Sequence, residues 1–444
     1  MATKPASEFI IENWFSARGW TPFTWQREVW SAFLENRSGL LNAPTGSGKT
    51  YALFMPAIIR FIREHPEDYQ TKEKNGLQML WVTPLRALAR DLESAMQQVI
   101  SDLGMAWKVQ RRTGDVSSAV KQKQKKQMPE VIIITPESLH VLLAQKEYPR
   151  RFRNLKTVVV DEWHELLGSK RGTQAELALS RLRGMNPELQ TWGISATIGN
   201  LEEAKEVLLG LPEPDDSVII RSGTAKQIDV KTVLPDDVES FPWSGHLGIN
   251  LLEKVLPILD KSGSTLIFTN TRSQSEIWFQ KLLEAKPDLA GTIALHHGSL
   301  DRSIRNWVEE SLHTGLLKIV VCTSSLDLGV DFTPVDTVIQ IGSPKGVARF
   351  IQRAGRSGHQ PDALSTIWFM PTHALELIEA AALKDAVENE RVEERIPLLK
   401  PIDVLIQYLV TLAVSEGFDP ETIYDEVTRT FAYQTLRRDE WEWI

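Results

Sequence analysis

Short apolar runs alternate with longer segments of helical periodicity along the first half of the chain. The runs are rich in β-branched residues, as is typical of strands buried on both faces of a parallel sheet. The predicted strands are residues 39–42, 79–82, 131–134, 157–160 and 190–194, and the helices between them include 51–63, 85–100 and one that begins at Glu137. The pattern predicts an open α/β lobe over residues 1–212.

A second alternating unit follows a break at residues 211–216, where prolines and acids interrupt the pattern. Its predicted strands are residues 265–269, 292–295, 318–321, 337–341 and 366–370, with helices at 273–285, 302–313 and 375–390. We assign residues 213–390 to a second parallel-sheet lobe. Residues 391–444 form a third region with a helix over 398–409, a stop at 417–420 and another helix from Glu421. The fold class is α/β.

The first predicted strand leads into Ala43-Pro44-Thr45-Gly46-Ser47-Gly48-Lys49-Thr50 and then a helix, the context of a phosphate-binding loop. Gly46 and Gly48 allow backbone amides to turn inward around a triphosphate, and the helix N-terminus adds positive potential. Lys49 is expected to reach the β- and γ-phosphates, and Thr50 to ligate Mg²⁺. We assign Thr45 to Thr50 to ATP binding. A glycine-rich turn with a surface lysine is the alternative.

Two adjacent acids, Asp161 and Glu162, end the strand at 157–160. In an ATP site, Asp161 would hold Mg²⁺ and Glu162 would orient or deprotonate the attacking water. An acidic helix start is the alternative. The hydroxyls of Ser195 and Thr197 follow the strand at 190–194 and would hydrogen-bond His164 and report the nucleotide state, unless they only cap a helix.

Composition changes this picture little. The 444 residues carry a net charge of −8 with a sequence pI of about 5.7, so a nucleic-acid partner has to be held by local basic patches. Cys322 is the only cysteine, which excludes disulfides within the chain and a cysteine metal site. Neither a membrane span nor a signal peptide is expected, and a cytoplasmic location follows.

Gln26 lies about twenty residues before Lys49 in an aromatic-rich opening segment. Its amide could pair with both the donor and the acceptor on the edge of adenine. The surrounding aromatic residues are expected to be core.

Polar side chains follow several predicted strands, where function sits in open parallel sheets. In the first lobe they include Arg86 and Thr135-Pro136-Glu137-Ser138, and in the second Asn270-Thr271-Arg272 and His297-Gly298-Ser299. Such donors can hold phosphates of a nucleic-acid backbone. Lysines and arginines near 111–126 and 150–153 form basic clusters, which are more often solvated faces than phosphate sites. A metal site at His296-His297 is not expected, because no cysteine or acid lies at ligand spacing.

The second lobe also holds Gln352-Arg353-Ala354-Gly355-Arg356-Ser357-Gly358-His359. An arginine here could neutralise charge on a transferring phosphoryl group bound to the first lobe, an effect worth roughly 10³ to 10⁵ in rate. We select Arg356 for this role. Arg353 is either structural or a substitute.

These motifs, in this order, resemble the DExH-box helicases of superfamily two. The runs Asp161-Glu162-Trp163-His164-Glu165-Leu166-Leu167-Gly168-Ser169-Lys170-Arg171-Gly172 and Trp192-Gly193-Ile194-Ser195-Ala196-Thr197-Ile198-Gly199-Asn200 are similar to the Lhr (large helicase-related) branch, the second most closely to its bacterial ligase-associated members. The match covers nearly the whole chain. It implies two RecA-like lobes and, over residues 391–444, the start of a winged-helix domain.

The resemblance also implies roles for single residues. Thr323 would touch the nucleic-acid backbone, Gly329 and Asp331 would lie near the ribose of ATP, and Gln352 would contact the γ-phosphate. A second arginine is usual in the family where this chain has His359, so a site with two arginine fingers is not expected here.

The function expected from residues and resemblance together is an ATP-dependent nucleic-acid helicase or translocase. The resemblance implies 3′ to 5′ movement on single-stranded DNA and on DNA or RNA:DNA duplexes, a role in DNA repair, ligase or nuclease partners, and a monomer that is the N-terminal core of a longer protein. The alternative is an ATP-gated clamp that holds nucleic acid without unwinding it. A metabolic kinase or transporter ATPase would leave the second lobe unexplained.

Overall fold

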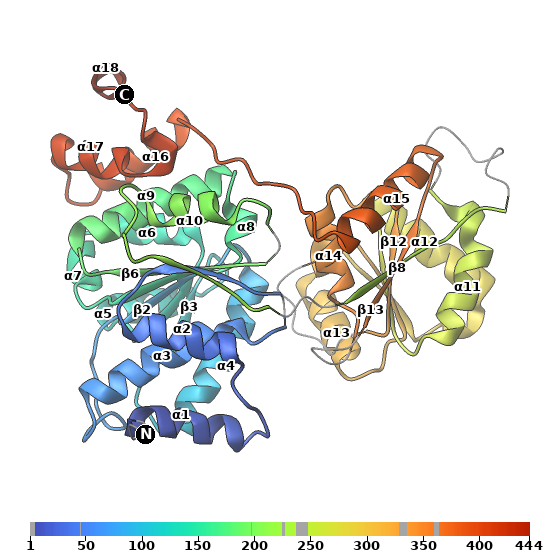
Figure 1. Ribbon diagram of the computed structural model, residues 1–444, viewed down its shortest axis with the longest axis horizontal. Coiled ribbons are helices and arrows are strands. Elements are labelled where there is room, and N and C mark those ends of the chain that lie inside the picture. The colour runs from blue at the N-terminus through green and yellow to red at the C-terminus, as the bar shows by residue number, and fades with distance from the viewer. Residues whose placement is uncertain are drawn as a thin grey trace. The chain divides into compact units, whose positions relative to one another are not determined.

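The computed structural model describes residues 5–44, 46–196, 198–223, 227–236, 247–327, 335–358 and 364–444. Thr45, Thr197, Gly329, Asp331 and His359, to which the sequence assigns roles, lie outside these ranges. The chain divides into two compact units (Figure 1). The first contains Met1–Ala43, Gly48–Gly223 and Glu394–Ile444, and the second contains Pro44–Ser47 and Thr224–Glu393.

The described part of the first unit contains a parallel sheet in the order β3-β4-β2-β5-β6-β1-β7. Its strands are β1 (Gly39–Asn42), β2 (Met79–Val82), β3 (Val109–Arg112), β4 (Val131–Ile134), β5 (Thr157–Val160), β6 (Gln190–Ser195) and β7 (Val218–Arg221). Successive residues of the central strands enter two different hydrophobic cores: Leu80 and Val82 one, Met79 and Trp81 the other. Side chains alternate across a strand, so both faces of this sheet are covered.

Helices on both faces supply these cores (Figure 1). They are α1 (Ala6–Ser16), α2 (Thr24–Leu34), α3 (Lys49–Glu64), α4 (Arg86–Asp102), α6 (Pro136–Leu143), α7 (Tyr148–Phe152), α8 (Trp163–Leu166), α9 (Lys170–Met185) and α10 (Leu201–Leu209). Helix α5 (Ser118–Lys126) adds no residue to these cores and buries Gln124. The opening aromatic residues Trp14, Phe15, Trp25 and Trp30 are buried, as expected. Trp20 is largely exposed, at 47 % of its surface.

The described part of the second unit contains another parallel sheet, in the order β10-β11-β9-β12-β13-β8. Its strands are β8 (Ile228–Thr232), β9 (Thr265–Phe268), β10 (Ile293–His296), β11 (Ile319–Cys322), β12 (Thr337–Ile341) and β13 (Ser365–Met370), and its α-helices are α11 (Leu252–Lys261), α12 (Arg272–Ala285), α13 (Arg302–His313), α14 (Val347–Ala354) and α15 (Leu375–Glu388). The predicted α/β class with two parallel-sheet lobes is confirmed.

The C-terminal helices α16 (Ile402–Ala413), α17 (Pro420–Thr428) and α18 (Arg438–Trp443) pack on the first unit, where α16 and α17 cover α6 and α9 (Figure 1). Leu405, Tyr408 and Leu412 share one hydrophobic core with Leu139 and Leu142 of α6. This segment therefore folds as part of the first unit. In the described part of the chain, no helix combines the length and hydropathy needed to cross a membrane.

Polar groups are buried at the same contact. Arg181 pairs with Glu426 at 2.7 Å, and the buried Glu176 carboxylate accepts a hydrogen bond from the Ala432 backbone N–H at 3.0 Å. Burial raises the pKa of Glu176 to about 8, although the Ala432 hydrogen bond and the nearby Arg183 oppose the shift. The folded protein therefore binds a proton here that the unfolded chain releases near its ordinary pKa.

We expect Glu176→Gln to change how stability depends on pH. Between the unfolded pKa near 4.3 and the folded pKa of about 8, the native state alone holds this proton, so stability falls as pH rises, by at most about 1.4 kcal/mol per pH unit. Glutamine keeps an oxygen acceptor for Ala432 but carries no titrating proton. Urea unfolding should show the variant more stable than the parent at pH 8 and the gap closing by pH 5. A pH-independent difference would contradict this.

Candidate nucleotide and nucleic-acid sites

The strand order divides the carboxyl edge of the first sheet into two halves. On one half, β1, β6 and β5 lie side by side and lead into the phosphate loop, Ser195 and Asp161. On the other half, β2, β4 and β3 lead into Arg86, Thr135 and Gly114. The fold thus brings together motifs that are far apart in the sequence and sorts them by type. The acids and the phosphate loop lie on one half of the edge, and arginine, hydroxyl groups and glycine lie on the other.

The loop before α3 has the backbone of a phosphate cradle. Gly46 and Gly48 adopt φ of +80° and +84°, values that side chains rarely permit. A Cβ at Gly46 would meet no atom within 4 Å, so this backbone faces open space. Ser47 Oγ donates to the Pro44 carbonyl at 2.8 Å, and Lys49 and Thr50 begin α3. The loop therefore fits a triphosphate.

Gln26 supports this loop directly. Its Nε2 donates to the Gly48 carbonyl at 3.1 Å, and its Oε1 accepts from the Phe23 backbone N–H at 2.9 Å. The side chain is buried, and a Cβ on Gly48 would lie 2.9 Å from Nε2. The amide thus caps α2 and braces the loop; adenine recognition by Gln26 stays a prediction.

A buried ion pair joins the loop to the acidic motif. Lys49 Nζ lies 3.1 Å from Glu162 Oε1, with side chains 10 % and 5 % exposed. Glu162 has a φ of +47° and immediately precedes α8. A left-handed backbone costs a residue with a Cβ roughly 1–2 kcal/mol, which packing has to offset. The fold holds this carboxylate against Lys49 in spite of that cost.

Asp161 lies beside this pair at the end of β5. Its Oδ1 accepts from the Glu162 backbone N–H at 2.9 Å, and its Oδ2 accepts from Trp81 Nε1 at 3.3 Å. Burial, followed by repulsion from Glu162, raises the pKa of Asp161 to about 6, and Lys49 opposes the shift. A divalent cation would remove this penalty.

The described residues contain no cluster of three or more His, Cys, Asp or Glu suited to a metal ion. Mg²⁺ does not require one, because it is commonly held by one or two carboxylates together with substrate phosphates and water. Asp161 and the half-buried Thr50 fit this kind of site.

His164 connects the acids to the segment after β6. Its Nδ1 accepts from the Ala196 backbone N–H at 3.2 Å, while Nε2 lies 3.5 Å from Glu162 Oε2. Burial lowers the pKa of His164, and the Nδ1 acceptor fixes the proton of the neutral ring on Nε2. We expected the hydroxyls of Ser195 and Thr197 to hydrogen-bond His164; within the described residues the Ala196 backbone amide does so, and the role of the hydroxyls stays a prediction. The Ser195 hydroxyl accepts and donates no hydrogen bond within the described residues, and Thr197 lies outside them.

Sequence reasoning missed Asn42, the last residue of β1. Its Nδ2 donates to the Ser195 carbonyl at 3.3 Å and also to the Ala196 carbonyl. Ala196 is therefore held on both sides, by Asn42 through its carbonyl and by His164 through its amide. A polar residue at the end of an apolar strand, directly before the phosphate loop, was the available signal.

On the other half of the edge, Arg86 is exposed and its guanidinium lies over Gly114, where a Cβ would come within 2.9 Å of Nη2. Thr135 Oγ1 accepts from the Ser138 backbone N–H at 3.4 Å and contacts the Ser138 hydroxyl at 3.0 Å, while Pro136 is buried. Thr135 therefore caps α6. A contact of the Thr135 or Ser138 hydroxyl with a nucleic-acid backbone would have to be made in addition to these hydrogen bonds.

The predicted donors of the second unit follow three neighbouring strands, β10, β11 and β9. Ser299 is exposed after β10, and Thr323 is half-buried after β11. After β9, the Asn270 Nδ2 donates to the Ser343 carbonyl at 2.9 Å and Arg272 pairs with Glu276 at 2.8 Å. The topology thus gathers Asn270, Arg272, Ser299 and Thr323 at one edge.

Arg353 of α14 and Arg356, which lies just after the end of this helix, have separate surroundings. Arg353 makes two hydrogen bonds to the Asp327 carboxylate, at 2.7 and 3.0 Å, and its guanidinium lies 4.7 Å from the centre of the Phe268 ring. It is 2 % exposed and structural. Arg356 Nη2 donates to the Asp327 backbone carbonyl at 2.8 Å, whereas the Asp327 carboxylate faces Arg353 and, at 3.5 Å, Arg349. Gln352 is buried on the same helix.

His296 and His297 are buried but do not share a ligand. His296 contacts the Ser325 hydroxyl at 2.7 Å and Glu309 at 3.1 Å, whereas His297 lies 3.6 Å from Glu276. Burial and then Arg272 lower the pKa of His297, with Glu276 opposing. His296 has hydrogen-bond partners on both ring nitrogens, whereas neither ring nitrogen of His297 has one within the described residues.

We expect Asn42→Ala to uncouple the segment after β6 from the phosphate loop. The Ser195 and Ala196 carbonyls lose a donor, so ATP turnover should fall about tenfold while ATP affinity stays within about twofold. Asn154→Ala is the matched control, since Asn154 Nδ2 also donates to a backbone carbonyl, that of Asn75 at 2.9 Å, outside this site. Steady-state kinetics that show equal losses in both variants would exclude the coupling role.

Comparison with known proteins agrees with this geometry. Residues 23–205 match the DEAD/DEAH box helicase family, residues 248–360 the helicase conserved C-terminal domain, and residues 385–444 the winged helix domain of the large helicase-related protein. The chain is 34% identical to the ATP-dependent helicase Lhr-Core protein 2 of Thermococcus barophilus, covering 96% of this chain and 50% of that protein.

It is also 30% identical to the Lhr helicase/probable uracil glycosylase of Mycolicibacterium smegmatis, over 98% of this chain and 31% of the relative. Among solved structures, the Mycobacterium smegmatis helicase Lhr bound to ssDNA and AMP-PNP superposes with a TM-score of 0.84 and 31% identity, over 99% of this chain and 57% of that one. The chain spans about half the length of the Thermococcus relative and about a third of the Mycolicibacterium relative. With both lobes, their motifs and the winged-helix match in the expected order, the chain belongs to the Lhr-type helicases of superfamily two.

Proposed function

We propose that this chain is an ATP-hydrolysing motor that moves along nucleic acid. The observation that carries the proposal is the division of one sheet edge between the buried Lys49–Glu162 pair and the exposed Arg86. Both halves belong to one hydrogen-bonded sheet. A nucleotide-dependent movement of the strands at one half would therefore also move the residues at the other half. The mycobacterial Lhr helicase was solved with ssDNA and AMP-PNP bound, which supports the same two kinds of ligand for this chain.

The ion pair between Lys49 and Glu162 would change partners when nucleotide binds. When a triphosphate enters the loop, Lys49 leaves Glu162 for the phosphates, because the phosphates carry more charge. Glu162 would then orient the attacking water, with His164 3.5 Å from its carboxylate and itself hydrogen-bonded by the Ala196 amide. When bound, Mg²⁺ neutralises charge on the phosphates, and Asp161 and Thr50 are the residues that would hold it.

We further propose that Arg356 acts in trans from the second lobe on nucleotide held by the first. Its guanidinium is anchored through one nitrogen to the Asp327 carbonyl. Arg353 already satisfies the Asp327 carboxylate, so Arg356 is the arginine of the pair suited to the reaction. Gln352 would contact the γ-phosphate, and Gly329 and Asp331 the ribose.

The finer proposals concern substrate and direction. We propose 3′ to 5′ movement on single-stranded DNA, with DNA or RNA:DNA duplexes as substrates and DNA repair as the setting, alongside ligase or nuclease partners. Backbone contacts carry no sequence information, so binding through Arg86, Asn270, Arg272, Ser299 and Thr323 should be sequence-tolerant and salt-sensitive. An ATP-gated clamp is the competing function, because the chain spans only about half of a curated Lhr-Core relative.

Strand displacement distinguishes the motor from the clamp. Duplexes with a 3′ or a 5′ tail are incubated with protein and ATP at two salt concentrations. The motor predicts slow displacement from the 3′ tail that requires ATP, while the clamp predicts binding without displacement. Robust unwinding from a 5′ tail would overturn the proposed direction.

We expect Glu162→Gln to abolish turnover but not ATP binding. The amide cannot act as a base or hold Lys49 by charge, so kcat should fall at least about 100-fold while an ATP analogue binds as well or better. Lys49→Ala is the comparison, since it should lose analogue binding. Near-parental hydrolysis by Glu162→Gln would remove Glu162 from its role.

Substitutions of Arg353 and Arg356 should affect different measurements. Lysine cannot replace the two hydrogen bonds of Arg353 to Asp327, so Arg353→Lys should lower the unfolding free energy by a few kcal/mol. Arg356→Lys should leave unfolding nearly unchanged and lower kcat by about 100-fold or more. Thermal unfolding and steady-state ATPase rates, measured on both variants, test this. Normal turnover in Arg356→Lys would contradict the proposed finger.

A further inference from the structure

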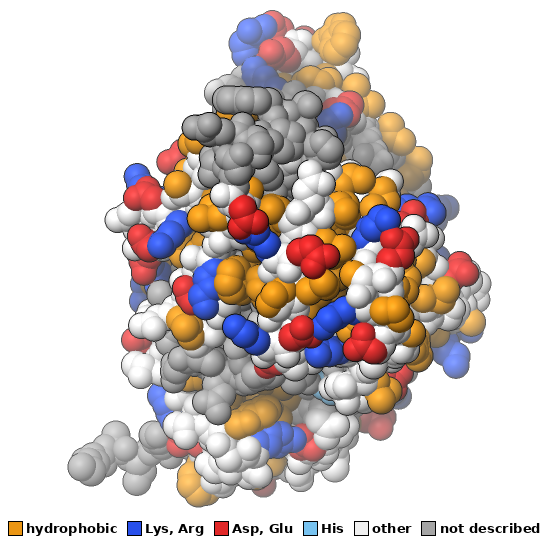
Figure 2. Space-filling view, turned by 90° about the vertical axis from the view of Figure 1, so that its right-hand side faces the viewer, with side chains coloured by type: hydrophobic (Ala, Val, Ile, Leu, Met, Phe, Trp, Pro, Cys, Tyr) orange, Lys and Arg blue, Asp and Glu red, His pale blue; other side chains and the backbone are white. Residues whose placement is uncertain are grey.

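The strongest local basic charge in the sequence lies outside the proposed sites. Between Trp107 and Met128 there are seven lysines or arginines and one acid, Asp115, in a chain whose net charge is −8. On the face of the molecule shown in Figure 2, by contrast, acidic and basic side chains are interspersed with apolar ones. Four of these seven side chains, Lys121, Lys123, Lys125 and Lys126, belong to α5.

Helix α5 connects the carboxyl edge of the sheet to the opposite, amino edge. It follows β3 and precedes β4, and because these strands are parallel neighbours the helix has to run back along the sheet. Lys121 Nζ donates to the Gly114 carbonyl at 3.2 Å, which places the first turn beside the edge that carries Arg86. Nine residues at 1.5 Å each span roughly 13 Å.

Only one side of this helix is committed to the fold. Gln124 is its buried residue, and its amide contacts Arg112 at 3.0 Å, Gln110 at 3.1 Å and the Arg111 carbonyl at 3.1 Å. Lys123, Lys125 and Lys126 are exposed. Within the described ranges, no carboxylate lies within ion-pair distance of Lys123 or Lys126, so their charge is directed at solvent.

The far end of α5 opens into a cavity of about 320 Å³ at the amino edge. Lys74, Lys108, Lys123 and Lys126 line it, together with the acids Glu73 and Glu130. Glu130 is buried and already accepts from the Lys108 backbone N–H at 2.9 Å and from Asn75 Nδ2 at 3.3 Å. The lysines therefore outnumber the acidic charge available to them.

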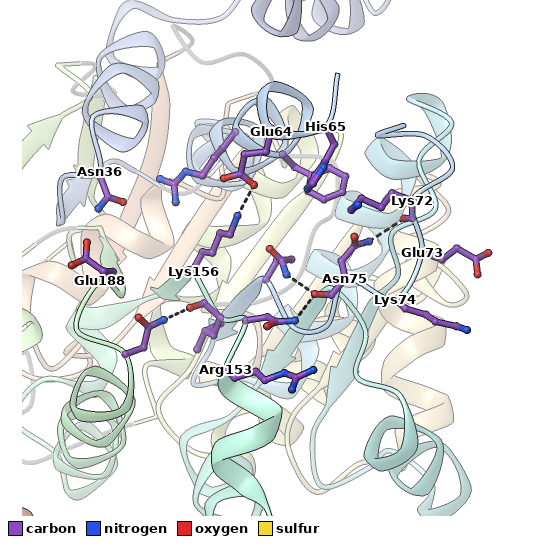
Figure 3. A pocket seen from close by; sticks show the side chains of 16 residues that line it. Asn36, Glu64, His65, Lys72, Glu73, Lys74, Asn75, Arg153, Lys156 and Glu188 are labelled. Atoms are coloured by element: carbon purple, nitrogen blue, oxygen red, sulfur yellow. Dashed lines mark hydrogen bonds and ion pairs between the residues drawn. The ribbon is translucent and has the colours of Figure 1, made fainter. Parts of the chain in front are cut away.

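A larger cavity of about 710 Å³ adjoins the first, and Glu73 and Lys74 line both. In Figure 3, Lys156 is tied to Glu64, whereas no interaction is drawn for Lys74 or Arg153. Lys74 has a φ of +60° and an exposed side chain. Acids also line the larger cavity, at Glu64, Glu73 and Glu188. The basic residues of the two cavities for which no ion pair or side-chain hydrogen bond is found within the described ranges are Lys74, Lys108, Lys123, Lys126 and Arg153, and we call this set the α5 path.

We propose that the α5 path binds the phosphate backbone of nucleic acid that extends beyond the strand held at the carboxyl edge. The inference rests on the proposed function, because it needs a strand at Arg86 and Gly114. Exposed ammonium groups without acidic partners suit repeated phosphates, and they carry no groups for reading bases. The surface is long, polar and open, unlike the mostly apolar pockets that enclose small ligands.

The test compares two triple variants with the parent. Lys108→Gln, Lys123→Gln and Lys126→Gln together remove charge from the path. Lys146→Gln, Arg150→Gln and Lys261→Gln together remove the same charge from other exposed positions for which no acidic partner is found within the described ranges. Unfolding temperatures establish that both variants fold. The probes are fluorescent single-stranded DNAs of roughly 8 and roughly 30 nucleotides, titrated at several salt concentrations.

The α5 variant should bind the long strand about tenfold more weakly at low salt. Its slope of log affinity against log salt should be smaller in magnitude by up to about 2, at about 0.7 per lost phosphate contact on a single strand. Its affinity for the short strand should match that of the parent, as should both affinities of the control variant. Equal long-strand slopes in all three proteins, or equal losses on both strands, would overturn the proposal. If the parent binds neither strand, the proposed function itself fails.

Discussion

The buried ion pair between Lys49 and Glu162 is the interaction on which the proposed chemistry of this protein depends. Two charges in a site with little water need each other, since either one alone would pay a large desolvation cost. In the proposed mechanism the pair holds the two catalytic groups against each other. A triphosphate would displace Glu162 from Lys49 by offering more negative charge, so nucleotide binding would itself release the carboxylate.

The surrounding network transmits this event. Glu162 faces His164, His164 accepts from the Ala196 amide, and the Ala196 carbonyl accepts from Asn42 at the start of the phosphate loop. The two ends of this chain of contacts therefore lie at the two elements that we propose hold the nucleotide, the acidic motif and the phosphate loop. Across the sheet, Arg86 and Gly114 stand at the ends of strands that share the same hydrophobic cores, which gives the nucleic-acid half a rigid connection to the nucleotide half.

Much of the architecture could be predicted from the sequence. Short, continuous runs of β-branched residues favour buried strands of a parallel sheet over other structures. Strands β2, β4 and β5 have the predicted bounds, and β1 does too. Strand β3 was missed, because Val109–Arg112 is mostly polar and sits at the sheet edge, where only part of the strand is buried. Strands β7 and β8 were missed in the segments around the proline-rich break for a similar reason: their residues are largely half-exposed.

Site residues that belong to a sequence motif could be predicted. Site residues whose role depends on a contact with another part of the fold could not. Lys49, Asp161 and Glu162 can be read from spacing, but the backbone contact of His164 and the bridging role of Asn42 depend on which strands are neighbours. The sequence likewise could not show that the Gln26 amide both caps α2 and supports the phosphate loop. The second contact depends on the backbone conformation of Gly48. The C-terminal helices could be predicted as helices, whereas their packing on α6 and α9 required the structure.

The most direct measurement is the rate of ATP hydrolysis with and without saturating single-stranded DNA. If the two halves of the sheet edge act together, single strands should raise kcat at least about tenfold in the parent protein and leave Glu162→Gln inactive under both conditions. Hydrolysis at the same rate with and without nucleic acid, across a range of salt concentrations, would contradict the account.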